Sequence, residues 1–196
     1  MTTPFLQFKK FISPFGLRDE DFDLLSQNCE LLNFKKGSII MNAGSKQNYI
    51  YFLSKGIVRN FVLTIDGEIS TYGFRIENSL ITGYGLHNYQ DEHRAIVSVE
   101  CLENCEMIKI PFSVLKFLEE NSKDAQKIAR YLAESHTISL VNFIISADTK
   151  TLLERYEELE LLFPNIHQRV SQHIIAGYLR ISRVHLSRIK KLRSKK

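Results

Sequence analysis

The chain is poor in cysteine and has no long apolar run. Its three cysteines, Cys29, Cys101 and Cys105, are odd in number and indicate reduced thiols, not a disulfide framework. No apolar stretch approaches the roughly 18 residues of a membrane-spanning helix. The first residues, MTTPFLQFKKF, lack the apolar segment of a signal peptide. We therefore expect a cytoplasmic protein with no structural disulfide and no membrane partner.

The sequence also lacks the motifs of common catalytic sites. It has no P-loop, no dinucleotide-binding glycine fingerprint and no nucleophile elbow. Cys101 and Cys105 are spaced as Cys-x3-Cys without a nearby third ligand, so semi-buried strand residues are the simpler interpretation. The β-rich region offers His87 and His93 but no His-x-His, whereas a cupin-type metal site needs clustered ligands. We expect a protein that is not an enzyme and has no metal or cofactor.

Acidic residues are absent from the C-terminal part of the chain. From Pro164 to Lys196 there are nine lysines or arginines and no aspartate or glutamate. The whole chain carries +4, so residues 1–163 carry −5. A basic tail on an acidic body predicts a polyanionic partner for the tail, although a frayed, solvated terminus is the alternative for its last lysines.

The first two thirds of the chain predict helices followed by many short strands. Residues 4–33 show helical spacing, with a turn at Pro14 and Gly16. Six β-rich runs follow, over residues 34–41, 49–53, 57–63, 69–74, 95–100 and 105–110. Glycines punctuate these runs, and Asp66-Gly67 indicates a hairpin. The pattern predicts an antiparallel jelly roll with flanking helices, within an α+β fold.

Helical periodicity returns after Pro111. It predicts a helix over 112–120 and a longer one from Lys123 to about Ala147. The apolar stripe of the long helix comprises Ile128, Leu132, Ile138, Val141 and Ile145. A helix about 35 Å long exceeds what the β domain can cover, so pairing with a second chain would bury the rest, unless the helix packs wholly within its own chain. Residues 146–149 read as a hinge, with Asp148 as N-cap of a helix over 149–162.

Two short helices are expected near the end of the chain. Ile174, Ile175, Tyr178 and Leu179 have helical spacing, and so do Leu186 and Ile189 after a short break. Ser171 and Ser182 stand where their hydroxyls can cap the two helices. Such a pair is too small to be stable alone, but it can present one helix to a DNA major groove.

In this order of elements, residues 22–193 resemble the Crp/Fnr superfamily of bacterial transcription regulators. The most specific segments are FKKGSIIMNAGSKQNYIYFLSKGIVR (34–59) and QHIIAGYLRISRVHLSRIKK near the C-terminus. The resemblance implies a cyclic-nucleotide-binding-like jelly-roll sensor over residues 1–122, a dimerisation helix over 123–147 and a helix-turn-helix domain over 148–196. It also implies a homodimer on a near-palindromic site in double-stranded DNA, with RNA polymerase as a further partner.

The resemblance assigns roles within the terminal helices, with residues 172–179 as the positioning helix and 183–191 as the recognition helix. Three residues match base-reading positions, Arg183, Val184 and Arg188. Arginine can bind guanine in a bidentate manner, whereas valine can contact only a thymine methyl. Val184 replaces an acidic residue common in the family, so a different operator is expected. Phosphate contacts are expected from Ser182, His185, Ser187 and Lys191, and further DNA contacts from Ser171 and Gln172. Arg180 stands where the family often has glycine at φ > 0.

The expected sensor site departs from the cyclic-nucleotide pattern. Family members that bind cyclic nucleotides have a Gly-Glu-Leu-type segment followed by an Arg-Ser pair. Here Gly83-Tyr84-Gly85 and Arg94-Ala95 stand at those positions. Tyr84 cannot act as a carboxylate acceptor and Ala95 offers no hydroxyl, at a cost of about 1–3 kcal/mol for each lost partner. We expect weak cyclic AMP binding at most, and an unknown small molecule as effector if there is one.

Several alternatives stay open at the level of the sequence. Arg94 can pair with Asp91 or Glu92 instead of holding a ligand. The chain can also be a small-molecule-binding signalling module, or a cupin-type enzyme, whose basic tail contacts protein or membrane. A salt titration against random duplex DNA separates these functions, because phosphate contacts weaken steeply with salt.

Overall fold

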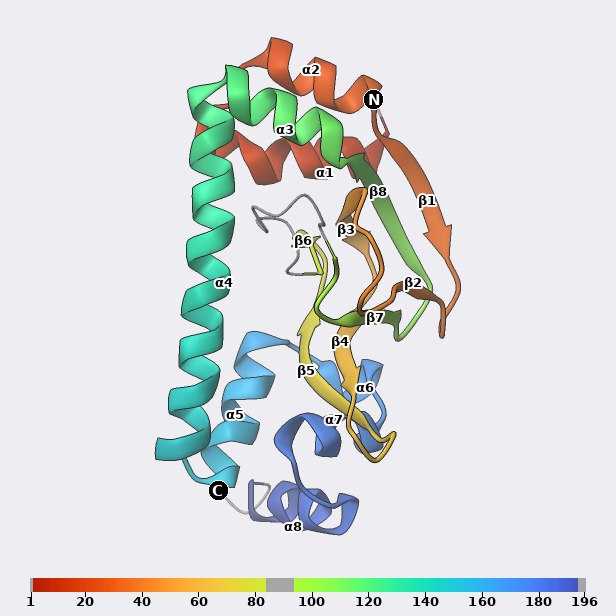
Figure 1. The fold of residues 1–196 in the computed structure, drawn as a ribbon. Helices are drawn as coiled ribbons and strands as arrows, with labels where there is room; N and C mark the ends of the chain where they lie inside the picture. The colour runs from red at the N-terminus through yellow and green to blue at the C-terminus, as the bar shows by residue number, and fades with distance from the viewer. Residues whose placement is uncertain (1, 84–93, 194–196) are drawn as a thin grey trace.

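The computed structural model describes residues 2–83 and 94–193 of the chain. Within these ranges, eight strands form the centre of the molecule, with three α-helices at one end and four at the other, and helix α4 runs along the side between the two ends (Figure 1). In the described residues no helix is long and apolar enough to cross a membrane.

The helices at the N-terminal end are short, and the first pair is separated by a turn that ends at a glycine. They are α1 (Thr3–Ile12), a 3₁₀ turn (Ser13–Phe15) and α2 (Asp19–Gln27). The turn closes at Gly16, whose φ of 75° lies in the left-handed region that glycine tolerates. Helix α3 (Phe112–Asn121) packs beside them, next to the start of α4.

The strands form two four-stranded antiparallel sheets. The strands are β1 (Glu30–Phe34), β2 (Ile39–Met41), β3 (Tyr49–Lys55), β4 (Val58–Leu63), β5 (Ile69–Arg75), β6 (Ser79–Ile81), β7 (Ser98–Cys101) and β8 (Cys105–Pro111). Their orders are β1-β8-β3-β6 and β2-β7-β4-β5. The strands β4 and β5 are joined through Gly67 at φ 77°, so the predicted hairpin is confirmed. The predicted jelly roll within an α+β fold is likewise confirmed.

The first sheet separates two hydrophobic cores because its side chains alternate between its faces. Phe52 and Ile110 belong to the core shared with the N-terminal helices, α3 and the start of α4. Leu53 follows Phe52 directly, and Met107 lies three residues before Ile110. Both belong to the other core, between the two sheets. Each of these four side chains is fully buried.

Two expectations for the ends of elements were wrong. The helical region does not extend to residue 33, because Glu30–Phe34 forms β1 and pairs with β8. Helix α4 (Lys123–Thr149) includes Asp148, so Asp148 is not the N-cap of the next helix. Thr151 caps α5 (Leu152–Leu162) instead, through a reciprocal capping box with Glu154.

The C-terminal helices pack on the jelly roll through a third core. They are α5, α6 (Ile166–Arg169), α7 (Gln172–Leu179) and α8 (Arg183–Arg193). Ile57, Phe74 and Leu102 of the jelly roll join buried side chains of these helices in one cluster. The Phe74 ring lies 5.2 Å from that of Tyr178 and 5.7 Å from that of Phe163. The terminal helices are therefore docked on the sheet that contains β4, β5 and β7.

Candidate nucleic-acid interface and sensor site

Two serines begin the two helices of the terminal motif. Ser171 Oγ accepts from the Ile174 N–H at 3.4 Å, and Ser182 Oγ accepts from the His185 N–H at 3.2 Å. Each hydroxyl thus accepts from an N–H in the first turn of its helix, where the i−4 backbone acceptors of the helix interior are missing. The predicted caps are confirmed, and α7 has the bounds expected for the positioning helix.

The turn between the helices is closed by Arg180 in a left-handed conformation. Its φ and ψ are 58° and 44°. The Arg180 N–H donates to Gly177 O at 3.1 Å, and the Ile181 N–H donates to Ala176 O at 3.0 Å. These bonds satisfy carbonyls at the end of α7, at a conformational cost of roughly 1 kcal/mol for a residue other than glycine. The expectation of φ > 0 at this position is confirmed.

Helix α8 buries one face and exposes the other. Leu186 and Ile189 are 0% and 3% exposed and pack with Ile175 and Leu179 of α7. The expected DNA-contacting residues of this helix are all exposed, namely Arg183, Val184, His185, Ser187, Arg188 and Lys191. Ser171, Gln172 and Ser182, at the start of the two helices, are exposed as well. The structure thus leaves each of the predicted contact residues accessible to a partner.

The charge of α8 is largely available to a partner. Among the described residues, no carboxylate forms an ion pair with Arg183 or Arg188. Arg193 differs, because it pairs with Glu160 of α5 and stacks over the Tyr156 ring at 6.0 Å. Burial, and then the adjacent Glu160, raise the pKa of Tyr156 to about 12. The ion pair of Arg193 therefore holds the end of α8 against α5, while Arg183 and Arg188 are exposed to solvent.

A second arginine, Arg169, links the C-terminal helices to the jelly roll through ion pairs. Arg169, at the end of α6, donates to the carboxylates of Glu77 and Glu103. Hydrogen bonds to Glu103 and then Glu77 raise the pKa of the Arg169 guanidinium. Burial acts to raise the pKa of Glu77, but the hydrogen bond from Arg169 and the N–H of Gly56 lower it overall. Sequence reasoning counted Arg169 only as part of the basic tail, and no local pattern identifies partners so distant in the chain.

The expected sensor site is partly described. Ala95 is buried, and the Ile96 N–H donates to Gly83 O at 2.9 Å, which places Gly83 and Ala95 side by side. The Arg94 side chain is exposed and donates through Nη1 to Gly44 O at 2.9 Å. The expected residue Tyr84 lies outside the described residues, as do Asp91 and Glu92, the alternative partners of Arg94, and the two histidines of the β-rich region.

Gln47 is a residue of the sensor site that sequence reasoning missed. Its Oε1 atom is buried and has no hydrogen-bond partner among the described residues. A Cβ built on Gly83 would lie 3.3 Å from this atom, so the amide is close to the Gly83 backbone. A buried acceptor without a partner costs free energy that a donor from a ligand or water can recover. No short motif marks a glutamine in such a role.

The three thiols are reduced and shielded. Cys101 and Cys105 end β7 and begin β8, and both are buried. Their side chains hydrogen-bond to each other, which raises the pKa of Cys101 and lowers that of Cys105. Burial raises the pKa of Cys29 to about 12. Within the described ranges, no three His, Cys, Asp or Glu side chains are grouped so as to hold a metal ion.

The structure thus combines a jelly roll, one long helix and an exposed basic helix-turn-helix in a single chain. The protein-family model of the cyclic nucleotide-binding domain matches residues 31–121. The fumarate and nitrate reduction regulatory protein of Yersinia pestis is 25% identical over 103 residues, which are 52% of this chain and 40% of that protein. The chain spans less than half the length of the curated relatives it matches.

Solved structures share the fold along most of the chain. A structure assigned to the Crp/Fnr family of transcriptional regulators, from Eubacterium rectale, has a TM-score of 0.71 at 19% identity, covering 90% of this chain and 83% of that one. FixK2 from Bradyrhizobium japonicum has a TM-score of 0.72 at 15% identity, covering 85% of each chain. The domain match, the relatives and the shared fold make the chain similar to transcription regulators of the Crp/Fnr superfamily.

Proposed function

We propose that this chain is a homodimeric, sequence-specific DNA-binding regulator whose sensor site does not bind cyclic AMP tightly. The observation that carries the proposal is the division of α8 into two faces. Leu186 and Ile189 anchor the helix in the core, while Arg183 and Arg188 are exposed without an ion pair among the described residues. A rigid helix with exposed arginines suits the major groove of a duplex.

The roles proposed for the contact residues follow from their chemistry. Arg183 and Arg188 would each bind the O6 and N7 acceptors of a guanine. Val184, with 64% of its surface exposed, would contact a thymine methyl or no base. The remaining polar residues proposed to contact phosphates, and so to set the register, are Ser171, Gln172, Ser182, His185, Ser187 and Lys191.

The proposed dimer rests on the exposed second half of α4. Ile138, Val141 and Ile145 are 59%, 46% and 50% exposed and lie on one face at intervals of three and four residues. The first half of the same stripe, Ile128 and Leu132, packs against the jelly-roll core of its own chain. The described residues of the chain itself leave Ile138, Val141 and Ile145 uncovered, which supports the dimer over a helix packed wholly within one chain. A second copy of α4 would remove the exposed apolar side chains from water.

The sensor proposal rests on the surroundings of Gly83. The buried Ala95 has no hydroxyl to offer a phosphate, and the exposed Arg94 is engaged with the Gly44 carbonyl. The Gln47 amide, whose Oε1 has no hydrogen-bond partner in the part of the chain that the structure describes, adds a neutral group where a cyclic nucleotide needs charge-assisted partners. We assign residues 1–122 to the sensor, 123–147 to the dimerisation helix and 148–196 to DNA binding, with RNA polymerase as the partner through which a bound dimer would act.

The test is selection of bound sites from a random duplex pool with the full chain. We expect a motif with two-fold symmetry and half-sites about 34 Å apart, one helical turn. Arg183→Ala combined with Arg188→Ala should abolish enrichment, whereas Arg130→Ala, which removes an exposed arginine of α4, should preserve it.

Two outcomes would contradict the proposal. Enrichment of the same motif by the double variant would mean that α8 does not read the bases. No enriched motif together with no retention of random duplex at low salt would mean that the basic helix serves a protein or membrane partner.

A further inference from the structure

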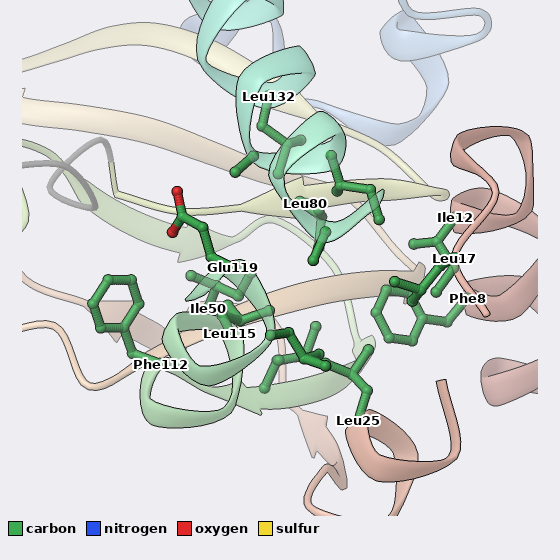
Figure 2. Close-up of a pocket in the computed structure, with 15 residues that line it drawn as sticks. Phe8, Ile12, Leu17, Leu25, Ile50, Leu80, Phe112, Leu115, Glu119 and Leu132 are labelled. Carbon is green, nitrogen blue, oxygen red and sulfur yellow. The ribbon is translucent and has the colours of Figure 1, made fainter. Parts of the chain in front are cut away.

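A cavity of about 90 Å³ lies between the first sheet and the helices that pack on it (Figure 2). Its floor is made by Ile50 of β3, Leu80 of β6 and Ile110 of β8. Helices α1, α2 and α3 supply further walls, and the first three turns of α4 supply another through Ala125, Ile128, Ala129 and Leu132, which leaves the cavity partly open to solvent. Of the residues proposed for the Gly83 site, those that the structure describes, Gly83, Arg94, Ala95 and Gln47, do not line this cavity.

The apolar lining of the cavity disfavours the binding of water and of charged molecules. Of the fifteen lining residues that the structure describes, fourteen are apolar, and Glu119 of α3 is the exception. A water molecule needs two to four polar partners to be stable in such a space, whereas an apolar molecule needs none. The Glu119 carboxylate would repel a ligand that carries a carboxylate of its own.

The small side chains of α4 create the space. Ala125 and Ala129 lie one turn apart on the face that meets the cavity, together with Ile128 and Leu132. A leucine at either alanine would project into the volume that is now empty. An unfilled apolar cavity destabilises a fold in proportion to its volume, and a ligand that fills it removes that penalty.

The size of the cavity limits the ligand. Apolar cavities of roughly 150 Å³ bind benzene and remain free of water. At about 90 Å³, this cavity can take a group no larger than a single ring or a short alkyl chain.

We propose that this cavity is a second binding site of the sensor region and takes a small uncharged apolar molecule. The occupant would touch the first turns of α4, the helix that continues to the terminal region. The binding itself is independent of DNA recognition. Only the step from binding to regulation rests on the proposed function.

The test uses the full chain without DNA and three probes, benzene, 1-hexanol and hexanoate. Benzene and 1-hexanol should raise the midpoint of thermal unfolding and shift the methyl resonances of Leu115, Ile128 and Leu132, while hexanoate should do so more weakly. Ala129→Leu should weaken benzene binding at least about tenfold. Ala133→Leu, the same change one turn on at an exposed position, should leave it unchanged.

The controls keep the proposal open to contradiction. If Ala129→Leu does not fold, Ala125→Leu fills the same space from the previous turn, and the methyl shifts of the unchanged chain still report the site directly. The proposal fails if neither neutral probe shifts those methyl groups, or if a folded Ala129→Leu or Ala125→Leu chain binds benzene as well as the parent. Hexanoate binding as tight as that of 1-hexanol would overturn the requirement for an uncharged ligand. Because no duplex is present, these outcomes are distinct from a failure of DNA binding.

Discussion

Arg169 donates to both carboxylate oxygens of Glu77, with Nη2 2.7 Å from Oε1 and Nη1 3.1 Å from Oε2. Glu77 follows β5 of the jelly roll, whereas Arg169 ends the helix just before the helix-turn-helix. The two hydrogen bonds fix the orientation of the guanidinium in addition to the attraction between the opposite charges. The terminal helices are thus held on the jelly roll of the same chain by a directed ion pair in addition to apolar packing.

Replacing this arginine should destabilise the chain in a pH-dependent way. Arg169→Ala leaves two partly buried carboxylates without their cation, and we expect a loss of roughly 1–3 kcal/mol in the free energy of unfolding. The figure is below that of a fully buried pair, because the three side chains remain 24% to 33% exposed. Urea denaturation of both chains measures the loss.

The sign of the pH dependence follows from Glu77, whose pKa lies below its ordinary value of 4.5 in the folded chain. The stabilisation is fully present above pH 4.5 and is lost as the pH falls through the lowered pKa. The difference between Arg169→Ala and the parent should therefore be constant above about pH 5.5 and shrink below 4.5. Arg130→Ala, which removes an exposed arginine, should show neither effect, and an equal loss at low pH would exclude the Glu77 pairing as its source.

The thiols should be unreactive in the folded chain. Cys101 and Cys105 are buried out of reach of a reagent, and burial raises the pKa of the half-buried Cys29 to about 12, so little Cys29 thiolate is present near neutral pH. A thiol reagent at pH 8 should modify fewer than one cysteine in the native chain and all three in guanidinium chloride. Rapid native reaction that Cys29→Ser removes would show that this thiol is more accessible than the structure places it.

The terminal motif was predictable because its determinants are local. Ser171 and Ser182 are caps that can be recognised from a few residues, and they set the observed starts of α7 and α8. The Thr151 capping box was equally local, since Thr-x-x-Glu is visible in the sequence, and the choice of Asp148 overlooked it.

The features that escaped prediction depend on contacts between distant segments. Glu30–Phe34 continues a helical pattern and becomes a strand only because β8 pairs with it. Gln47 belongs to the sensor site only because the fold places it close to Gly83. The alanines of α4 line a cavity only because the first sheet faces them. Neither arrangement leaves a period or motif in the sequence.

Dimerisation should depend on the exposed stripe of α4. Val141→Glu would place a charge on a face where Ile138 and Ile145 are also exposed, and a carboxylate buried between two apolar helices is strongly unfavourable. Sedimentation should show a dimer for the parent chain and a folded monomer for the variant. Ser139→Glu, about 100° around the helix from Ile138, should remain dimeric. A dimeric Val141→Glu chain would assign the interface to another surface.

The two kinds of proposed DNA contact should separate in their salt and sequence dependence. Arg188→Ala removes a base contact, so it should cost about 1–3 kcal/mol on the selected site and relax the preference at one position. Lys191→Ala removes a phosphate contact, so it should weaken binding to every sequence and reduce the slope of log K against log salt by about 1. Both side chains are exposed on α8 and lie one turn apart, which makes each the control for the other. Titrations of the selected duplex and a scrambled one at several salt concentrations measure both quantities. If the two variants lose affinity equally for both duplexes, Arg188 contacts the backbone, and the sequence preference must come from another residue of the helix.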